Sequence, residues 1–257
     1  MHICVEPQLL TSLPAKLYLL AYNLEKDRMY PNRHLGRALR AAALAELEAD
    51  GWVVDDHGLV RVAGTSPEGA RSQEARPGET GPTPREPGSG GATGPTPRGG
   101  AGRADPLVAA VFRQISSEPT PRSWGHWIDH DHRAAVLETR DDLESAGWLR
   151  VARGQLLSLI PTSAVVLLER PRVRELNRAA GRVLRGEVSP SDAAPDLVPL
   201  VALAAAGNVI TLVSAGERRA FADRIRALVA LTGCAATALA PPKYRPPRVP
   251  PRVPPRV

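Results

Sequence analysis

Three arginines near the start of a long Ala/Leu-rich stretch have the spacing that best suits binding chemistry. Arg33, Arg37 and Arg40 recur at helical intervals in RHLGRALRAAALAELEADGW, so we expect them on one face of a helix over residues 33–50 that Gly51 ends. Bases in the first turns oppose the preference of the helix dipole for acids there. A cationic row at a positive helix end is a place where an anion binds. A solvated arginine face explains the same pattern, and spacing alone does not decide between the two.

A second polar group lies in HWIDHDH, which contains His126, Asp129, His130, Asp131 and His132. His126 and His130 are one helical turn apart and have the residue type of zinc ligands, which Asp129 or His132 could complete. No third ligand is indicated in a distant part of the sequence. We therefore interpret the cluster as a surface segment at a helix end, and we expect neither a metal site nor a cofactor.

The sequence lacks the motifs of the common catalytic sites. It contains no phosphate-binding loop, dinucleotide fingerprint, nucleophile elbow or zinc spacing. The two cysteines, Cys4 and Cys234, are too few for a disulfide framework and fit a reducing cytoplasm. No signal peptide is recognised, and the apolar run 17–22 is too short to span a bilayer. We expect a non-enzymatic protein of the cytoplasm.

The elements around the arginine row are predicted to be helices and short hairpins. Alternation in WVVDDHGLVRV predicts a hairpin with His57-Gly58 as its turn, and a second hairpin is predicted around Arg153-Gly154. The predicted helices cover residues 13–23, 33–50, 105–115 (capped by Asp105), 123–130 (opened by Ser123), 132–147, 171–184, a segment led by Asp192 or Asp196 up to Gly207, and 215–231. This pattern predicts a mainly α fold, a single helical domain with short β-hairpins.

Composition divides the chain into four segments. Residues 1–63 and 105–240 have the hydrophobic pattern of a folded domain. Residues 64–104 repeat GPTPR and are too poor in apolar side chains to offset the entropy of ordering, so we predict a disordered Gly/Pro-rich insertion. Residues 241–257 repeat PPRV and are predicted to be a disordered, Pro/Arg-rich tail. The tail carries five bases and no acid, which accounts for most of the net charge of +6, so the folded part is close to neutral.

Two similar stretches, LEADGWVV at 47–54 and LESAGWLR at 143–150, each join a helix end to a strand. A helix followed by a β-wing is also the order of a winged-helix DNA-binding domain. DNA affinity depends on clustered bases, whereas this folded part is neutral and the second stretch has acids at Asp141, Asp142 and Glu144. A winged-helix-like regulator is kept as an alternative, but the charge does not favour nucleic acid as a partner.

The order of the sequence blocks resembles that of the Golgi phosphoprotein 3 family, in particular its bacterial, actinomycete-type members. The similar blocks are LPAKLYLLAYN, LGRALRAAALAELEADGWV, PRSWGHWIDH and RAAVLETRDDLESAGWLR, and they span roughly residues 10–240 apart from the insertion. The resemblance implies a mostly helical single domain with short hairpins. It also implies a peripheral membrane protein, because eukaryotic members bind phosphatidylinositol 4-phosphate and help to retain glycosyltransferases in the Golgi.

The resemblance further implies a head-group pocket. In the family this pocket uses a Trp, an Arg on the second helix and two Arg three residues apart on a later helix. The second-helix arginine corresponds to Arg40, and the first of the paired arginines corresponds to Arg133. The second paired arginine falls on Val136, and the Trp falls near Pro31, where the nearest aromatic residue is Tyr30. The implied pocket lacks one cation and one tryptophan, which leaves the native lipid open.

We expect Arg40 and Arg133 to hold a phosphate by charge-assisted hydrogen bonds. Arg33 and Arg37 would add positive field, and Tyr30 would lie at the level of the membrane interface. The expected partner is an anionic or phosphoinositide lipid membrane surface, met from the cytoplasm at the inner face of the membrane. The five bases of the tail would add nonspecific attraction of about 1 kcal/mol each near an anionic leaflet.

The apolar residues Val166 and Leu167 lie in a VVLL segment before the helix over 171–184. They are candidates for contact with lipid or with another copy of the chain, and burial in the core is the alternative. A third hypothesis makes the chain a structural adaptor whose PPRV tail binds a proline-reading domain. A membrane-bound protein client and a homo-oligomer are further partners that the sequence leaves open.

Overall fold

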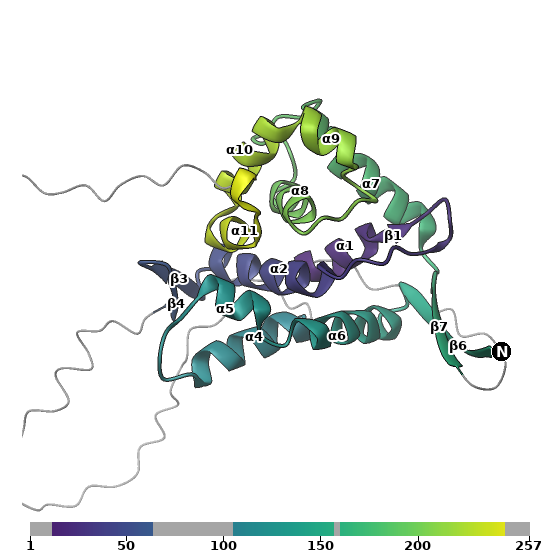
Figure 1. The fold of residues 1–257 in the computed structure, drawn as a ribbon, viewed down its shortest axis with the longest axis horizontal. Helices are drawn as coiled ribbons and strands as arrows, with labels where there is room; N and C mark the ends of the chain where they lie inside the picture. Colours follow the sequence, from purple (N-terminus) through teal and green to yellow (C-terminus); the bar gives the residue numbers. More distant parts are fainter. Residues whose placement is uncertain (1–11, 64–104, 157–159, 245–257) are drawn as a thin grey trace, which may run out of the picture.

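A computed structural model describes residues 12–63, 105–156 and 160–244, and their helices lie in three layers (Figure 1). The central layer holds α1 (Leu13–Leu20) and α2 (Leu35–Ala49). On one side lie α4 (Pro106–Ser117), α5 (Trp124–Asp129) and α6 (His132–Ser145). On the other lie α7 (Arg170–Arg185), α8 (Leu197–Ala206), α9 (Ala215–Ala220), α10 (Ala222–Thr232), α11 (Cys234–Leu239) and the short η1 (Pro242–Tyr244). The predicted mainly α fold is confirmed.

Within the described residues, the strands form three small antiparallel sheets at the edges of these layers. They are β1 (Tyr22–Asn23) with β2 (Arg28–Met29), β3 (Val53–Asp56) with β4 (Leu59–Val62) and β5 (Arg122–Ser123), and β6 (Leu149–Leu156) with β7 (Ile160–Leu167). The predicted turn of the first hairpin is confirmed. His57 and Gly58 both have positive φ, at 53° and 87°, as the tight hairpin turn that matches strand twist requires.

The second hairpin was predicted around the wrong residues. Arg153 and Gly154 lie inside β6 and pair with Ser163 and Thr162 of β7. The pairing of β6 with β7 extends from Leu149↔Leu167 to Leu156↔Ile160, so the connection falls at residues 157–159, outside the described residues. A local turn signal was overridden by a ladder that runs through it.

Local capping chemistry sets most helix boundaries as predicted. The Asp105 carboxylate accepts hydrogen bonds from the backbone N–H groups of α4, and the Ser123 hydroxyl accepts one from the first turn of α5. Gly51 and Gly147 end their helices with φ of 74° and 78°. Two predicted helices were too long: α1 stops at Leu20, and residues 215–231 divide into α9 and α10.

The start of α2 differs from the prediction in a way that affects the arginine row. The Asn32 side chain accepts a hydrogen bond from the N–H of His34 and donates to the carbonyl oxygens of Gly207 and Asn208. This fixes a turn before the helix, so α2 begins at Leu35. Arg33 therefore lies outside the helix and does not share a helical face with the other two arginines.

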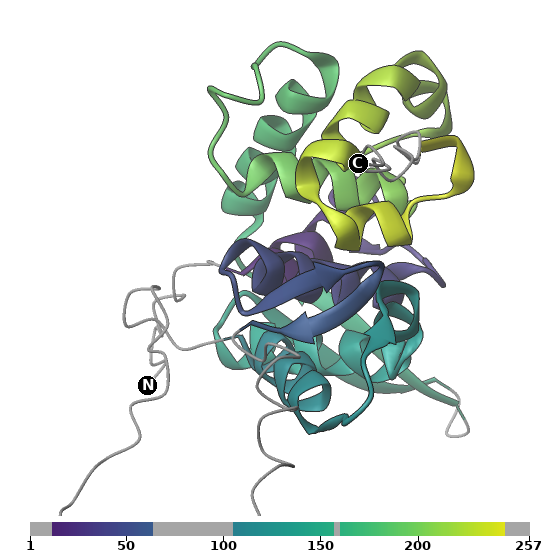
Figure 2. The same ribbon diagram turned by 90° about the vertical axis from the view of Figure 1, so that its left-hand side faces the viewer.

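Helix α2 is enclosed by the layers on both of its sides (Figure 2). Gly36 lies against α6 so closely that a Cβ atom there would be 1.8 Å from the carbonyl oxygen of His132. Gly207, at the end of α8, lies against the other side of α2. A Cβ atom added to Gly207 would be 2.5 Å from the Cβ atom of Ala38. Residues from all three described ranges, 12–63, 105–156 and 160–244, contribute to one hydrophobic core.

The acids at the end of α2 act on other helices. The Glu46 carboxylate accepts a hydrogen bond from the N–H of Leu13, the first residue of α1. The Glu48 carboxylate accepts from the N–H groups of Cys234 and Ala235 at the start of α11. Acids that are unfavourable for their own helix dipole therefore cap the amino ends of two neighbours. Burial is the main reason that the pKa of Glu46 rises to about 7.

The predicted insertion over 64–104 lies outside the described residues, as does most of the predicted tail, from residue 245 onward. Within the part of the chain that the structure describes, no helix has the length and apolar character needed to cross a bilayer.

Candidate functional site

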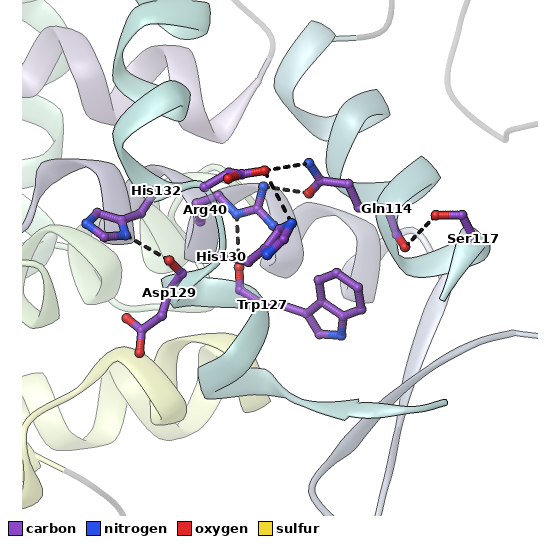
Figure 3. Close-up of polar contacts among 8 residues, drawn as sticks. Arg40, Gln114, Ser117, Trp127, Asp129, His130 and His132 are labelled. Atoms are coloured by element: carbon purple, nitrogen blue, oxygen red, sulfur yellow. Dashed lines mark hydrogen bonds and ion pairs between the residues drawn. The ribbon is translucent and has the colours of Figure 1, made fainter. Parts of the chain in front are cut away.

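Arg40 is a buried cation at the interface between α2 and the layer of α4, α5 and α6 (Figure 3). Its side chain is 1% exposed. The Nε–H group donates to the backbone carbonyl of Trp127 at 2.9 Å, and Nη1 donates to Oε1 of Gln114 at 2.8 Å. Both acceptors are uncharged, so the two bonds orient the guanidinium group without neutralising it.

The remaining nitrogen of this guanidinium group, Nη2, is buried and has no hydrogen-bond partner within the described residues. Burial lowers the pKa of Arg40 below its ordinary value, and the nearby carboxylates of Asp131 and Glu138 act in the opposite direction. A buried N–H group of a cation without an acceptor is costly, and such groups in native structures need an explanation. An anion at Nη2 would provide one.

The polar contacts continue from Arg40 towards the start of α6. Nε2 of Gln114 donates weakly to Oδ2 of Asp131 at 3.5 Å, and Nε2 of His130 lies 3.2 Å from the same oxygen (Figure 3). Asp131 precedes α6 in a left-handed conformation, with φ of 45°, and gives the helix no side-chain cap. The amino end of α6 is thus uncapped beside a buried arginine, which places two features that attract anions in one region.

Arg133 lies in the first turn of α6 and is exposed. The preceding residue, His132, is the one whose carbonyl oxygen touches Gly36, one helical turn before Arg40 in α2. The structure therefore brings the backbones that carry the two predicted arginines into direct contact. Val136, which replaces the second paired arginine, is partly buried and lies with Cγ2 3.3 Å from the Cβ position of Gly36.

The other predicted head-group residues are placed differently. Nε of Arg37 lies 2.6 Å from Oδ1 of Asp129, so this arginine has an internal carboxylate partner. Arg33 is exposed in the turn before α2. Tyr30 is 38% exposed, in the segment that follows β2. Among these predicted residues, Arg40 is the one that is almost completely buried. Nε of Arg37 is shielded from solvent too, and its short contact with Asp129 is an ion pair without hydrogen-bond geometry.

The two predicted membrane-contact residues lie on opposite faces of β7. Val166 is 41% exposed, whereas Leu167 is 4% exposed and belongs to the core. Adjacent residues of a strand point to opposite faces, so the two could not both meet lipid from this element. Leu168, which follows the strand, is 45% exposed and is the second exposed apolar residue here.

The histidine cluster has ring contacts among its own members. The rings of His126 and His130 stack with centroids 5.8 Å apart, and Nδ1 of His132 lies 2.8 Å from the carbonyl oxygen of Asp129. A search of the described residues finds no group of three side chains arranged to hold a metal ion.

A family model described as Golgi phosphoprotein 3 (GPP34) matches residues 13–245. The chain belongs to the Golgi phosphoprotein 3 family. A search of curated proteins finds no match. The matched range includes Arg40, Gln114, Trp127 and Arg133, so the candidate site of this Golgi phosphoprotein 3 family member lies within the part of the chain that the family model matches.

Sequence reasoning missed Gln114 and the carbonyl oxygen of Trp127, which together fix the Arg40 guanidinium group. Neither has a distinctive local signal, because a glutamine on an amphipathic helix and a backbone carbonyl occur in every helical protein. Both are far from Arg40 in the sequence, so only the packing of α4 and α5 against α2 reveals them.

Proposed function

We propose that this protein is a non-enzymatic peripheral membrane protein that binds a phosphorylated lipid head group at Arg40 and Arg133. By resemblance to eukaryotic members of the family, the head group is that of phosphatidylinositol 4-phosphate, met at the cytoplasmic face of a membrane. The observation that carries the proposal is the buried guanidinium group of Arg40, with uncharged acceptors on Nε and Nη1 and none on Nη2.

The energetics favour an anion beside this group. Keeping a charge in a buried site without an opposite charge costs several kcal/mol. A phosphate would offset that cost and would accept hydrogen bonds from Nη2 of Arg40, from the exposed Arg133 side chain and from the uncapped amino end of α6. The site then depends on two arginines where the resemblance implies three.

The carboxylates of Asp131 and Glu138 are close enough to Arg40 to raise its pKa. Their negative charges therefore also oppose the binding of an anion at this site. Asp131→Asn would remove one of these charges and keep an amide of the same size. We expect this variant to bind anionic head groups more tightly than the wild-type chain, roughly fivefold for a gain of about 1 kcal/mol.

The DNA-binding alternative requires a recognition helix that can enter a groove. Helix α2 is enclosed by other helices on both sides, with Leu39 and Leu44 fully buried. Helix α6 is partly exposed, but it carries Asp141 and Asp142, which phosphates repel. The adaptor alternative rests on the PPRV repeats, which lie outside the described residues.

Flotation with phosphatidylcholine vesicles tests the lipid proposal. Vesicles that contain phosphatidylinositol 4-phosphate are compared with vesicles that carry the same total charge as phosphatidylserine. We expect the full chain to prefer the phosphoinositide, and we expect Arg133→Ala to lower this preference at least fivefold, as the loss of one charge-assisted contact implies. Arg219→Ala, an exposed arginine on α9 in the opposite layer, is the matched control (Figure 1). Equal flotation of both variants on every vesicle would contradict the proposal.

A further inference from the structure

A second pocket with guanidinium groups lies on the other side of α2, towards α8, α9 and α11. Its volume is about 400 Å³, which is within the range of small-molecule sites. Its lining includes His34 and Arg37 from the start of the central layer, the end of α8 with Asn208, Arg218 from α9, and Tyr244. None of these side chains takes part in the hydrogen bonds that orient the Arg40 guanidinium group.

Arg218 has a buried nitrogen that faces no acceptor. Its Nη1 atom is shielded from solvent and has no hydrogen-bond partner within the described residues. The backbone of the same residue is held in place, because its carbonyl oxygen accepts a hydrogen bond of 3.2 Å from the hydroxyl of Tyr244, which is 2% exposed. The arginine is therefore anchored at its backbone and unsatisfied at its charged end, which indicates a missing acceptor.

The charge of the pocket is positive. Among the described residues, its lining contains two guanidinium groups, those of Arg37 and Arg218, and no carboxylate. Arg37 is paired with Asp129 at 2.6 Å, but the Asp129 side chain is 59% exposed and lies outside the lining. An exposed carboxylate is screened by water, so it compensates the pocket only in part.

The carboxyl ends of α8 and α11 also face this pocket, and their dipoles disfavour an anion. At the end of α8 part of this effect is offset, because the amide of Asn32 donates to the carbonyl oxygens of Gly207 and Asn208. The full charge of Arg218 and the partly compensated charge of Arg37 together exceed the partial charges at these helix ends.

We propose that this pocket binds a phosphate monoester, with Arg37 and Arg218 as its charged contacts. A phosphate monoester has three terminal oxygens, so it can accept hydrogen bonds from two guanidinium groups that belong to different helices. A carboxylate has two oxygens, and a single guanidinium group can bind both. The wall formed by Ala205, Ala238 and Leu239 is apolar and suits the carbon part of the ester. The proposal is independent of the lipid site at Arg40 and does not require it.

Isothermal titration of the full chain with glycerol 3-phosphate tests the pocket with a soluble ester. We expect binding by the wild-type chain and by Arg219→Ala, whose exposed side chain lies next to Arg218 on α9 but outside the pocket. Arg218→Gln should weaken it about tenfold or more, as the loss of a charge-assisted hydrogen bond implies. Asn208→Asp, which adds a carboxylate to the lining at an exposed position, should weaken it similarly while leaving the circular dichroism spectrum unchanged.

A second arm distinguishes a soluble ester from a lipid head group. If glycerol 3-phosphate does not bind, but flotation on vesicles with phosphatidylinositol 4-phosphate falls in Arg218→Gln and not in Arg219→Ala, the monoester belongs to a lipid. The proposal is wrong if Arg218→Gln matches Arg219→Ala in both arms. Arg133→Ala should leave the titration with glycerol 3-phosphate unchanged, so failure of this pocket and failure of the lipid site give different results.

Discussion

The two guanidinium sites on either side of α2 differ in how many of their hydrogen bonds are made within the protein. Arg40 is buried and held by Trp127 and Gln114, with one nitrogen left over. Arg37 and Arg218 border an open pocket, and the buried Nη1 atom of Arg218 has no acceptor among the residues that the structure describes. The first site is thus built into the packing of the fold, whereas the second is an open recess on the surface of the packed helices.

This difference arises from a small rotation on one helix. Side chains three residues apart on an α-helix point about 60° apart around its axis. That rotation is enough to send Arg40 towards α4 and α5 and to place Arg37 at the border with α8 and α11, where it pairs with Asp129 at the end of α5. A row of arginines that looks like one patch in the sequence therefore serves two separate places.

Glycine substitutions on the two sides of α2 should have the largest effects and should differ in size. Gly36→Ala places a methyl group 1.8 Å from the backbone oxygen of His132, which cannot move without separating α2 from α6. We expect a loss of about 3 kcal/mol or more in the free energy of unfolding, measured with urea. Gly207→Ala meets the Cβ atom of Ala38 at 2.5 Å and should cost less, about 1–2 kcal/mol.

Gly216→Ala, in α9, is the matched control, because nothing lies within 4 Å of its Cβ position. Alanine is the better helix former, so this variant should be neutral or more stable by up to about 1 kcal/mol. Equal losses for Gly36→Ala and Gly207→Ala would show that the two contacts of α2 are equivalent, against the account given above.

Alanine substitutions of Arg40 and Arg218 should have different effects on stability, because Arg40 supports the fold and Arg218 does not. Arg40→Ala leaves the Gln114 side chain and the Trp127 carbonyl without their donor and opens a cavity, so we expect it to cost about 2–4 kcal/mol. Arg218→Ala removes no side-chain hydrogen bond or ion pair within the described part of the chain and should change stability by about 0.5 kcal/mol or less. Thermal unfolding of both variants without ligand measures the contrast; a large loss for Arg218→Ala would give that residue a structural role.

The features that the sequence predicts correctly are those set by residues close together along the chain. Asp105, Ser123 and Gly51 set helix boundaries through bonds within a few residues, and each was placed correctly. The turn expected at Arg153-Gly154 failed because the register of β6 and β7 is fixed along their whole length. Arg33 was assigned to the helix because the bonds of Asn32 to the end of α8 have no sequence signal.

The candidate site was predictable only in part, for the same reason. Arg40 and Arg133 followed from the resemblance, and their helices do meet at Gly36. The acceptors that orient Arg40 come from α4 and α5, and Arg218 comes from a helix that no binding motif marked. Long-range packing decides which arginine is buried, which is paired and which borders a cavity.

The smallest expected effect concerns His34 in the second pocket. Burial is the main cause that lowers its pKa below the ordinary value, and the positive charges of Arg33 and Arg37 lower it further. A bound phosphate monoester stabilises the imidazolium form, so the pKa of His34 should rise when glycerol 3-phosphate is added. NMR titration of the imidazole ring measures this; the ring of His57, 97% exposed on its hairpin, should not respond.

The most direct test of the lipid site observes Arg40 itself. Its Nε–H group is buried and hydrogen-bonded, so it should give a protected signal in ¹H–¹⁵N spectra of the arginine side chains. We predict that glycerophosphoinositol 4-phosphate, the deacylated head group, shifts this signal in a saturable manner and that Arg133→Ala abolishes the shift while Arg219→Ala preserves it. An Arg40 signal that stays in place at every concentration of the head group, in an otherwise folded protein, would contradict the account.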